Sequence, residues 1–311
     1  MKLKILLTGK NGQVGGDLAQ LLPRLGEVVA LDRQHLDLTK ANEIRRLIQD
    51  VRPNVIVNAA AYTAVDQAEK EEALARVVNA DAPGIMAEEA KNIGALLVHY
   101  STDYVFDGSK TTPYMEDDPP NPLNAYGSTK LAGEHAIAAS GAPHLILRTE
   151  WVYATRGRNF LLTILRLATQ HQEFKVVNDQ IGSPTWSREI AAATARIIEK
   201  LASQTGSFTQ LSEVRATYHM TAGGQASWYD FAHKILENAA RIPKGPGWFA
   251  AATGGRPLLA TRVLPIPSSE YPTLARRPAY SLLSNSLLAR TFGIQLPDWQ
   301  EQLESAVGRG E

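Results

Sequence analysis

Short apolar runs alternate with longer stretches of helical periodicity along the first half of the chain. Such runs are typical of strands buried on both faces of a sheet. The predicted strands are Lys4–Thr8, Glu27–Leu31, Asn54–Asn58, Ala95–Ser101 and His144–Arg148. The predicted helices are Gln13–Leu22, Lys40–Val51, Glu69–Gly94 (two helices, the second starting at Asp81-Ala82-Pro83) and Tyr126–Ser140. This alternation predicts an α/β fold with a doubly wound, Rossmann-like parallel sheet.

The alternation is less regular after Asn159. Here the pattern predicts helices over Phe160–His171, Ser187–Ala202 and Trp228–Arg241, and strands over Lys175–Val177 and Tyr218–Thr221. Residues 243–278 are rich in Pro and Gly, and we expect Gly245–Arg256 to be a loop. We therefore predict a dinucleotide-binding domain over residues 1–155, with sheet additions from 156–222. Residues 156–311 are expected to form mainly a smaller, intertwined substrate-binding lobe.

The composition narrows the classes of function. The 311 residues include 32 Lys+Arg and 32 Asp+Glu, so the formal net charge of zero predicts no nucleic-acid partner. With no cysteine, the chain has no disulfides, thiolate nucleophiles, iron–sulfur clusters or cysteine zinc sites. The first apolar run is too short for a signal peptide, and no apolar run is long enough to span a bilayer. We expect a cytoplasmic protein without a membrane partner.

A glycine-rich turn follows the first predicted strand and opens the first helix. It contains Gly9, Gly12 and Gly15. In this position glycines let backbone amides approach a pyrophosphate at a helix N-terminus. A turn that needs glycine only for its own backbone is the alternative, but the place at the start of a βαβ unit favours a dinucleotide.

Two charged residues end the second strand and bear on the choice of cofactor. Asp32 can accept hydrogen bonds from the adenine ribose hydroxyls, which favours NADH. Arg33 can instead pair with a 2′-phosphate, which favours NADPH. Both NADH and NADPH therefore remain open as cofactors.

A candidate reactive pair lies at the start of the fourth predicted helix. Tyr126 and Lys130 are four residues apart, hence on one face if the helix begins near Asn124. An ammonium beside a phenol stabilises the phenolate, so we expect Lys130 to lower the pKa of Tyr126 while also holding ribose hydroxyls. Such a pair also occurs by chance in many helices, so a catalytic interpretation depends on the residues around it.

The neighbours come from the end of the fourth predicted strand, at the edge where open α/β sheets bind ligands. Thr102 is placed there to hydrogen-bond a substrate carbonyl, although a plain strand-end cap is the alternative. His99 in the same strand is more simply a buried core histidine than a catalyst.

Taken together, these motifs resemble the extended short-chain dehydrogenase/reductases, and longer segments resemble their dTDP-4-dehydrorhamnose reductase family. The shared motifs are Gly9-x-x-Gly12-x-x-Gly15, Asn58-Ala59-Ala60-Ala61, Ser101-Thr102-Asp103 and Tyr126-x-x-x-Lys130. The longer segments are Asn58–Asp66, His99–Phe106, Arg148–Tyr153 and Asn178–Thr185, with Tyr271-Pro272-Thr273 and Arg277-Pro278 near the end.

The resemblance implies reduction of the 4-keto group of dTDP-4-dehydro-β-L-rhamnose by NAD(P)H to dTDP-L-rhamnose. It implies that Tyr126 donates the proton, that Lys130 binds the nicotinamide ribose and that Thr102 orients the carbonyl. Asp103 and Trp151 match the family's substrate contacts. The matching cofactor positions, beside the glycine loop, are Gly12, Gln13, Val14, Asp32, Asp37, Leu38, Ala61, Tyr62, Thr63, Tyr100, Tyr126 and Lys130.

The chain departs from the family at a few positions. Some members form a homodimer around Mg²⁺ held by glutamates, but the matching positions here are Asp17 and Arg188, and an arginine cannot ligate a cation. We therefore expect no metal, and either a monomer or a homodimer. Glu150 stands where many relatives have a small hydroxyl residue.

Two other functions within the superfamily remain as alternatives. The first is a non-catalytic NADP-binding regulatory subunit, against which the intact Thr102, Tyr126 and Lys130 argue. The second is another nucleotide-sugar epimerase or dehydratase, against which the segments around Val65 and Trp151 argue. The expected partner is a dTDP-sugar.

Overall fold

The computed structural model describes residues 2–204, 208, 216–241 and 247–308. Within these residues the main sheet has six strands, and every neighbouring pair is parallel. From edge to edge the strands are β10 (Ala216–His219), β5 (His144–Thr149), β4 (Leu96–Thr102), β3 (Val55–Asn58), β1 (Leu3–Thr8) and β2 (Gly26–Leu31). This confirms the doubly wound sheet. The strand order changes direction between β3 and β1, where such sheets bind ligands.

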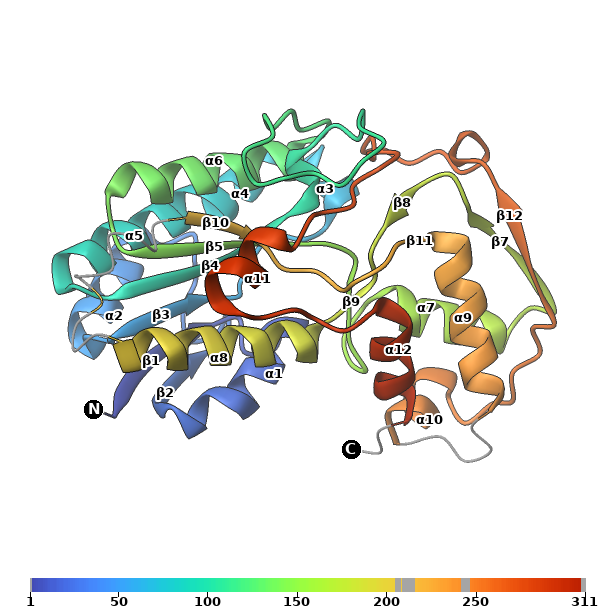
Figure 1. Cartoon of the computed structure of the whole chain (residues 1–311), viewed down its shortest axis with the longest axis horizontal. Helices are drawn as coiled ribbons and strands as arrows, with labels where there is room; N and C mark the ends of the chain where they lie inside the picture. The colour runs from blue at the N-terminus through green and yellow to red at the C-terminus, as the bar shows by residue number, and fades with distance from the viewer. Residues whose placement is uncertain (1, 205–207, 209–215, 242–246, 309–311) are drawn as a thin grey trace.

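Helices cover both faces of the sheet (Figure 1). On one face lie α1 (Gln13–Leu21) and α8 (Ser187–Gln204), with α11 (Ser286–Phe292) against β10. On the other lie α2 (Ala41–Val51), α5 (Ala82–Ile93) and α6 (Ala125–Ser140). Ahead of α5 come α3 (Val65–Ala68), α4 (Glu72–Arg76) and a π-helical turn (Val77–Asp81). Helix α5 thus begins where the sequence predicted a second helix.

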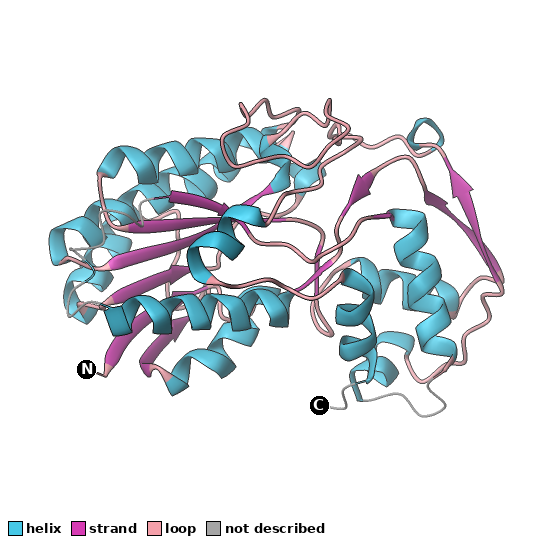
Figure 2. Cartoon of the chain, in the orientation of Figure 1, coloured by secondary structure: helices cyan, strands magenta, loops and turns pink. Residues whose placement is uncertain are grey.

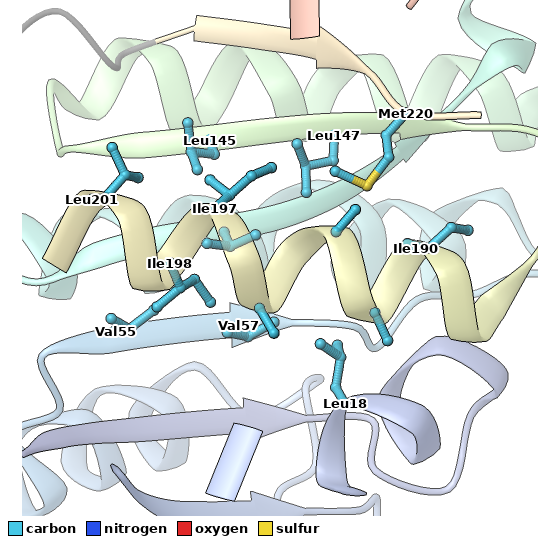
Figure 3. Packing of buried hydrophobic residues seen from close by; sticks show 14 of the residues in the cluster. Leu18, Val55, Val57, Leu145, Leu147, Ile190, Ile197, Ile198, Leu201 and Met220 are labelled. Carbon is cyan, nitrogen blue, oxygen red and sulfur yellow. The ribbon is translucent and has the colours of Figure 1, made fainter. Parts of the chain in front are cut away.

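Alternate strand residues point to opposite faces of the sheet, and helices cover both faces. The predicted strands are therefore apolar throughout. Figure 3 shows strand residues packed against α8. The buried residues labelled there are Leu18, Val55, Val57, Leu145, Leu147, Ile190, Ile197, Ile198, Leu201 and Met220. Helix α8 lies in the second half of the chain, yet it packs on the main sheet. The lobe that holds this sheet, the first lobe, is therefore completed by residues from the second half of the chain.

The smaller lobe combines helices with short strand pairs (Figure 2). Its helices are α7 (Phe160–Ala168), α9 (Trp228–Ala240), α10 (Gly247–Thr253) and α12 (Trp299–Gly308). Its strand pairs are β7 (Glu173–Val177) with β12 (Arg262–Ile266), β8 (Ile181–Gly182) with β11 (Ala226–Ser227), and β6 (Val152–Tyr153) with β9 (Thr185–Trp186). Among the described residues, no helix is both long enough and apolar enough to cross a membrane.

The expected loop over Gly245–Arg256 is wrong for its described part. Residues 245 and 246 lie outside the described residues, and α10 occupies Gly247–Thr253. Its three consecutive alanines favour a helix, and Trp248 anchors it by packing into the same buried cluster as α7 and α9. Strand β12 lies in the Pro/Gly-rich stretch and was also not predicted. In the described structure it pairs with one strand, β7, and so is an edge strand. Edge strands tolerate proline, which explains how β12 can contain Pro265.

Candidate functional site

A cleft of about 1020 Å³ lies at the carboxyl ends of the sheet strands, where residues of the smaller lobe complete its wall. All the site residues predicted from the sequence line it except Gly15. Those lining it are Gly9, Gly12, Gln13, Val14, Asp32, Asp37, Leu38, Ala61, Tyr62, Thr63, Tyr100, Thr102, Asp103, Tyr126, Lys130 and Trp151. The fold therefore brings together segments that are far apart in the sequence.

The glycine loop shapes the end of this cleft next to α1. Gly9 has φ of +74°, in the left-handed region that favours glycine. A Cβ on Gly15 would lie 2.0 Å from the Gly9 carbonyl oxygen, so Gly15 serves the turn rather than the cleft. Gly12 borders the cleft and caps α1 without a side chain, which leaves the first amides of the helix available to a phosphate. The loop therefore fits a dinucleotide.

Asp32 is held at the edge of the cleft by several donors. Its carboxylate accepts hydrogen bonds from His35 Nδ1 (2.6 Å) and from Asn11 Nδ2 (3.2 Å), and Lys10 Nζ lies 3.4 Å away. The hydrogen bond from His35 is the main cause that holds the pKa of Asp32 well below its usual range. Asp32 is thus ionised, with the cation of Lys10 beside it.

Two predicted cofactor contacts use their side chains elsewhere. The carboxylate of Asp37 accepts from the amide and hydroxyl of Thr39, at 3.0 and 2.9 Å, and so closes its own turn. The Tyr100 hydroxyl lies 2.7 Å from Thr194 Oγ1 on α8, so the phenol points into the core. Asp37 Oδ1 and the Tyr100 hydroxyl therefore already have partners within the chain.

Tyr126 lies in the first turn of α6. Asn124 caps this helix by accepting from Gly127 N at 2.8 Å, which confirms the predicted start. Loss of solvent around the phenol raises the pKa of Tyr126 to about 12, although the Thr102 hydroxyl opposes the shift. The expected lowering of the Tyr126 pKa is wrong for this structure, because burial outweighs the hydrogen bond with Thr102 and the charge of Asp103 adds to the rise.

Lys130 is buried below the cleft. Its Nζ donates to the Tyr100 carbonyl oxygen at 2.5 Å and lies 3.2 Å from His99 Nε2, and burial lowers the pKa of Lys130 to about 8. The Ala60 amide donates to Asn58 Oδ1, so the Asn58 amide nitrogen faces His99 Nδ1 at 3.0 Å. We infer that neutral His99 carries its proton on Nε2.

His99 is fully buried, as predicted, and burial holds its pKa well below the usual value. The sequence did not predict its contact with Lys130. A side chain in the strand interior and one on α6 meet only because α6 packs beside β4. His99 therefore contributes to the surroundings of a candidate catalytic residue.

Two buried carboxyl groups lie beside Thr102. Thr102 Oγ1 donates to Asp103 Oδ1 at 2.9 Å, and burial raises the pKa of Asp103 to about 6. Glu150, which the sequence marks as a departure, lines the cleft and is only 1% exposed. It accepts from Ser281 Oγ and from Leu283 N, both at 3.4 Å.

An indole pair closes the cleft on the side of the smaller lobe. The rings of Trp151 and Trp228 stack with centroids 3.5 Å apart and an angle of 5° between planes. Trp151 has φ of +46°, an uncommon conformation for a bulky residue, and a Cβ on Gly182 would lie 2.6 Å from its ring. Trp228 was not predicted as a site residue, because no local pattern distinguishes it from an ordinary first residue of α9.

Arg277 also lines the cleft and was noted only as part of a family motif. Its Nη2 donates to Asp66 Oδ2 at 2.8 Å, which fixes the guanidinium across a long sequence separation. The guanidinium also lies near the Tyr104 phenol, where it opposes the rise in the pKa of Tyr104 that burial causes. A fixed cation on the wall suits an anionic group of a substrate.

The two positions that match the family's metal ligands do not form a metal site here. Asp17 is buried, accepts from Arg156 Nη1 at 3.0 Å and from Ser187 Oγ at 2.5 Å, and so has its charge balanced within the chain. In the described part of the chain, no group of three His, Cys, Asp or Glu side chains is placed to hold a metal. These residues do not fit Mg²⁺.

Comparisons with known proteins agree with this arrangement. Residues 2–310 match the family model described as the RmlD substrate binding domain. The chain is 50% identical over 300 residues to the dTDP-4-dehydrorhamnose reductase of Burkholderia thailandensis, covering 96% of each chain. It is 36% identical to the dTDP-4-dehydrorhamnose reductase of Bacillus anthracis in complex with NADP, with a TM-score of 0.83 and coverage of 98% and 99%. A dTDP-4-dehydrorhamnose reductase from Clostridium acetobutylicum is also 36% identical, with a TM-score of 0.85 and 98% coverage of each chain.

Proposed function

Because the chain belongs to the dTDP-4-dehydrorhamnose reductase family, we propose that it reduces the 4-keto group of dTDP-4-dehydro-β-L-rhamnose with NAD(P)H. The product is dTDP-L-rhamnose. The observation that carries this proposal is the meeting of Thr102, Tyr126 and Lys130 with the glycine loop in one cleft. A non-catalytic cofactor-binding subunit does not need this set, and the Tyr126 proton donor is part of the proposal.

When bound, the cofactor supplies the hydride for the carbonyl carbon. Tyr126 gives its phenolic proton to the carbonyl oxygen as negative charge develops there. With its pKa raised to about 12, the phenol is protonated at neutral pH and ready to act in the direction of reduction. Thr102 binds the same oxygen and fixes its distance from the phenol.

The other residues orient the two reactants. Lys130 holds the nicotinamide ribose hydroxyls, and the first amides of α1 bind the pyrophosphate. Asp103 and Trp151 contact the sugar, whose apolar face suits an indole. Arg277 faces the diphosphate of the sugar nucleotide. Asp32 and Arg33 both line the cleft, where Asp32 would accept from the adenine ribose hydroxyls and Arg33 would pair with a 2′-phosphate, so both NADH and NADPH are accepted.

We place the reaction in the cytoplasm, with a monomer or a homodimer that needs no bridging Mg²⁺. The partner is a small dTDP-sugar, and neither nucleic acid nor membrane is needed. Asp17 already pairs with Arg156 and accepts a hydrogen bond from Ser187, which supports a protein without this metal.

The test is consumption of NADPH and of NADH by the purified protein, given dTDP-4-dehydrorhamnose made in situ. We expect both cofactors to be oxidised and dTDP-L-rhamnose to be identified by mass spectrometry and NMR. Cofactor binding without consumption would instead favour a regulatory subunit or another nucleotide-sugar substrate. Stoichiometric NAD⁺ retained through purification would favour an epimerase or dehydratase.

A further inference from the structure

Two carboxyl groups leave the main sheet side by side. Thr102 of β4 pairs with Thr149 of β5, so the next residues, Asp103 and Glu150, emerge from neighbouring strand ends. Both side chains are buried, at 2% and 1% exposure. Ser281, also 1% exposed, lies against both of them.

The contacts in this cluster favour a proton on one carboxyl. Ser281 has a single hydroxyl proton, which it donates to Glu150 Oε2 at 3.4 Å, and it also lies close enough to Asp103 to lower the pKa of that carboxyl. Asp103 Oδ2 is buried and has no hydrogen-bond partner within the described structure. If Glu150 is protonated, it donates to Ser281 Oγ, and Ser281 is then free to donate to Asp103 Oδ2. That arrangement satisfies the groups that two ionised carboxylates would leave unmatched.

The surroundings place the proton on Glu150 and the charge on Asp103. Asp103 has a closer side-chain donor, since Thr102 Oγ1 lies 2.9 Å from it, whereas Ser281 Oγ lies 3.4 Å from Glu150, whose other donors are the backbone amides of Ser183 and Leu283. Burial raises the pKa of both carboxyls, to about 6 for Asp103 and well above the usual value for Glu150.

Other titratable groups face this pair from several elements. The phenols of Tyr104 and Tyr126 face Asp103, and the phenol of Tyr280 faces Glu150. Phenols are neutral at neutral pH, and the raised pKa values of these three keep them neutral at higher pH as well. We therefore assign a change in the hydrogen bond of Thr102 to movement of a proton between the two carboxyls.

We propose that Glu150 stores a proton that passes through Ser281 to Asp103 when the substrate carbonyl binds, which frees the Thr102 hydroxyl to donate to that carbonyl. The inference rests on the proposed function, since it assigns the carbonyl as the new partner of Thr102. The Glu150 O–H bond breaks, its proton joins Ser281 Oγ, and the Ser281 proton moves to Asp103. No electrons are exchanged, and the protons return after product release. Glu150 is thus a positioning residue.

Glu150→Gln is the main test, because an amide keeps the shape and can donate to Ser281 but has no proton to transfer. Ser281→Ala removes the relay hydroxyl, and Ser281→Thr restores it. We expect Glu150→Gln and Ser281→Ala to lower kcat about tenfold at about pH 8, the worth of one well-placed hydrogen bond. At about pH 5 the deficit should vanish, because solvent then protonates Asp103 directly. The KM for the cofactor should not change.

The matched control is Ser183→Ala. The hydroxyl that this change removes donates to the Ala222 carbonyl, and the Ser183 backbone amide that faces Glu150 is kept. Any loss in that variant should be the same at all pH values. An equal loss at every pH in Glu150→Gln, or no loss at about pH 8, would overturn the inference.

A second measurement does not depend on turnover. The infrared difference spectrum between wild type and Glu150→Gln at neutral pH should contain the carbonyl stretch of a protonated carboxylic acid. Its absence would overturn the stored proton even if the enzyme is an active reductase. Wild-type protein that binds cofactor and gives this band, yet does not reduce dTDP-4-dehydrorhamnose, would overturn the proposed function and the assigned role of the proton together.

Discussion

His99 Nε2 lies 3.2 Å from Lys130 Nζ, and the hydrogen bonds of Asn58 place the imidazole proton on the nitrogen that faces the amine. Two donors then face each other whenever Lys130 is charged. Together with burial, which lowers the pKa of Lys130 to about 8, this contact makes the charge of Lys130 sensitive to mild alkali.

Replacing His99 with Gln should move that titration. The Gln carbonyl can accept a hydrogen bond from the ammonium, so the pKa of Lys130 should rise by about one unit, equivalent to about 1.4 kcal/mol. In wild type, steps that need the ammonium should be lost as the pH rises through about 8. In His99→Gln this limb of the kcat/KM profile should lie at higher pH. An unchanged limb would show that His99 does not influence Lys130.

Tyr126→Phe should keep cofactor binding and lose most turnover. The change removes only the phenolic oxygen that we assign as proton donor, so a loss of about 10²–10⁴-fold in kcat is expected. Cofactor affinity, followed by NADPH fluorescence, serves as the control because the ring remains. Turnover equal to wild type would remove Tyr126 from the mechanism.

Asp32→Asn should weaken NADH binding more than NADPH binding. The carboxylate accepts from ribose hydroxyls in NADH, whereas for NADPH its removal also relieves repulsion with the 2′-phosphate. A difference of about tenfold between the two KM values, or about 1.4 kcal/mol, is expected. The ratio of the two KM values measures it directly, and an unaltered ratio would remove the ribose role from Asp32.

Glu134→Gln should destabilise the fold. Arg148 donates to the two carboxylate oxygens of Glu134 at 2.9 and 2.6 Å, and both side chains are buried. Loss of the partner charge leaves a buried guanidinium uncompensated, so unfolding in urea should show a loss of about 3–5 kcal/mol.

The control for that measurement is Glu88→Gln. Glu88 also pairs with an arginine, Arg45, but its side chain is 55% exposed. Solvent screens this pair, so a change of at most about 1 kcal/mol is expected. Equal effects of the two variants would mean that the Glu134 pair contributes no more than a surface pair.

The parts of the site with a local signal could be predicted from the sequence. Buried parallel strands give short apolar runs, a phosphate turn needs glycines, and an i, i+4 spacing puts Tyr126 and Lys130 on one helix face. These signals also predicted which edge of the sheet holds the cleft.

The remaining parts depend on contacts between distant segments. Nothing near Glu150 in the sequence shows that Ser281 will meet it, and nothing near Trp151 shows that Trp228 will cover its ring. The predicted direction of the pKa shift at Tyr126 was wrong for a related reason. Burial raises this pKa, and burial depends on the whole fold. Short alanine-rich α10 was missed because its anchor, Trp248, packs against helices distant in sequence.

The first lobe takes β10, α8 and α11 from the second half of the chain, while α12 after them returns to the smaller lobe. A fragment ending at residue 155 would therefore lack an edge strand and α8, which buries one face of the sheet together with α1 and α11. Neither lobe is a contiguous piece of the chain. The two lobes should melt together in one cooperative transition, and evolution could not have exchanged the substrate lobe by simple fusion at a single junction.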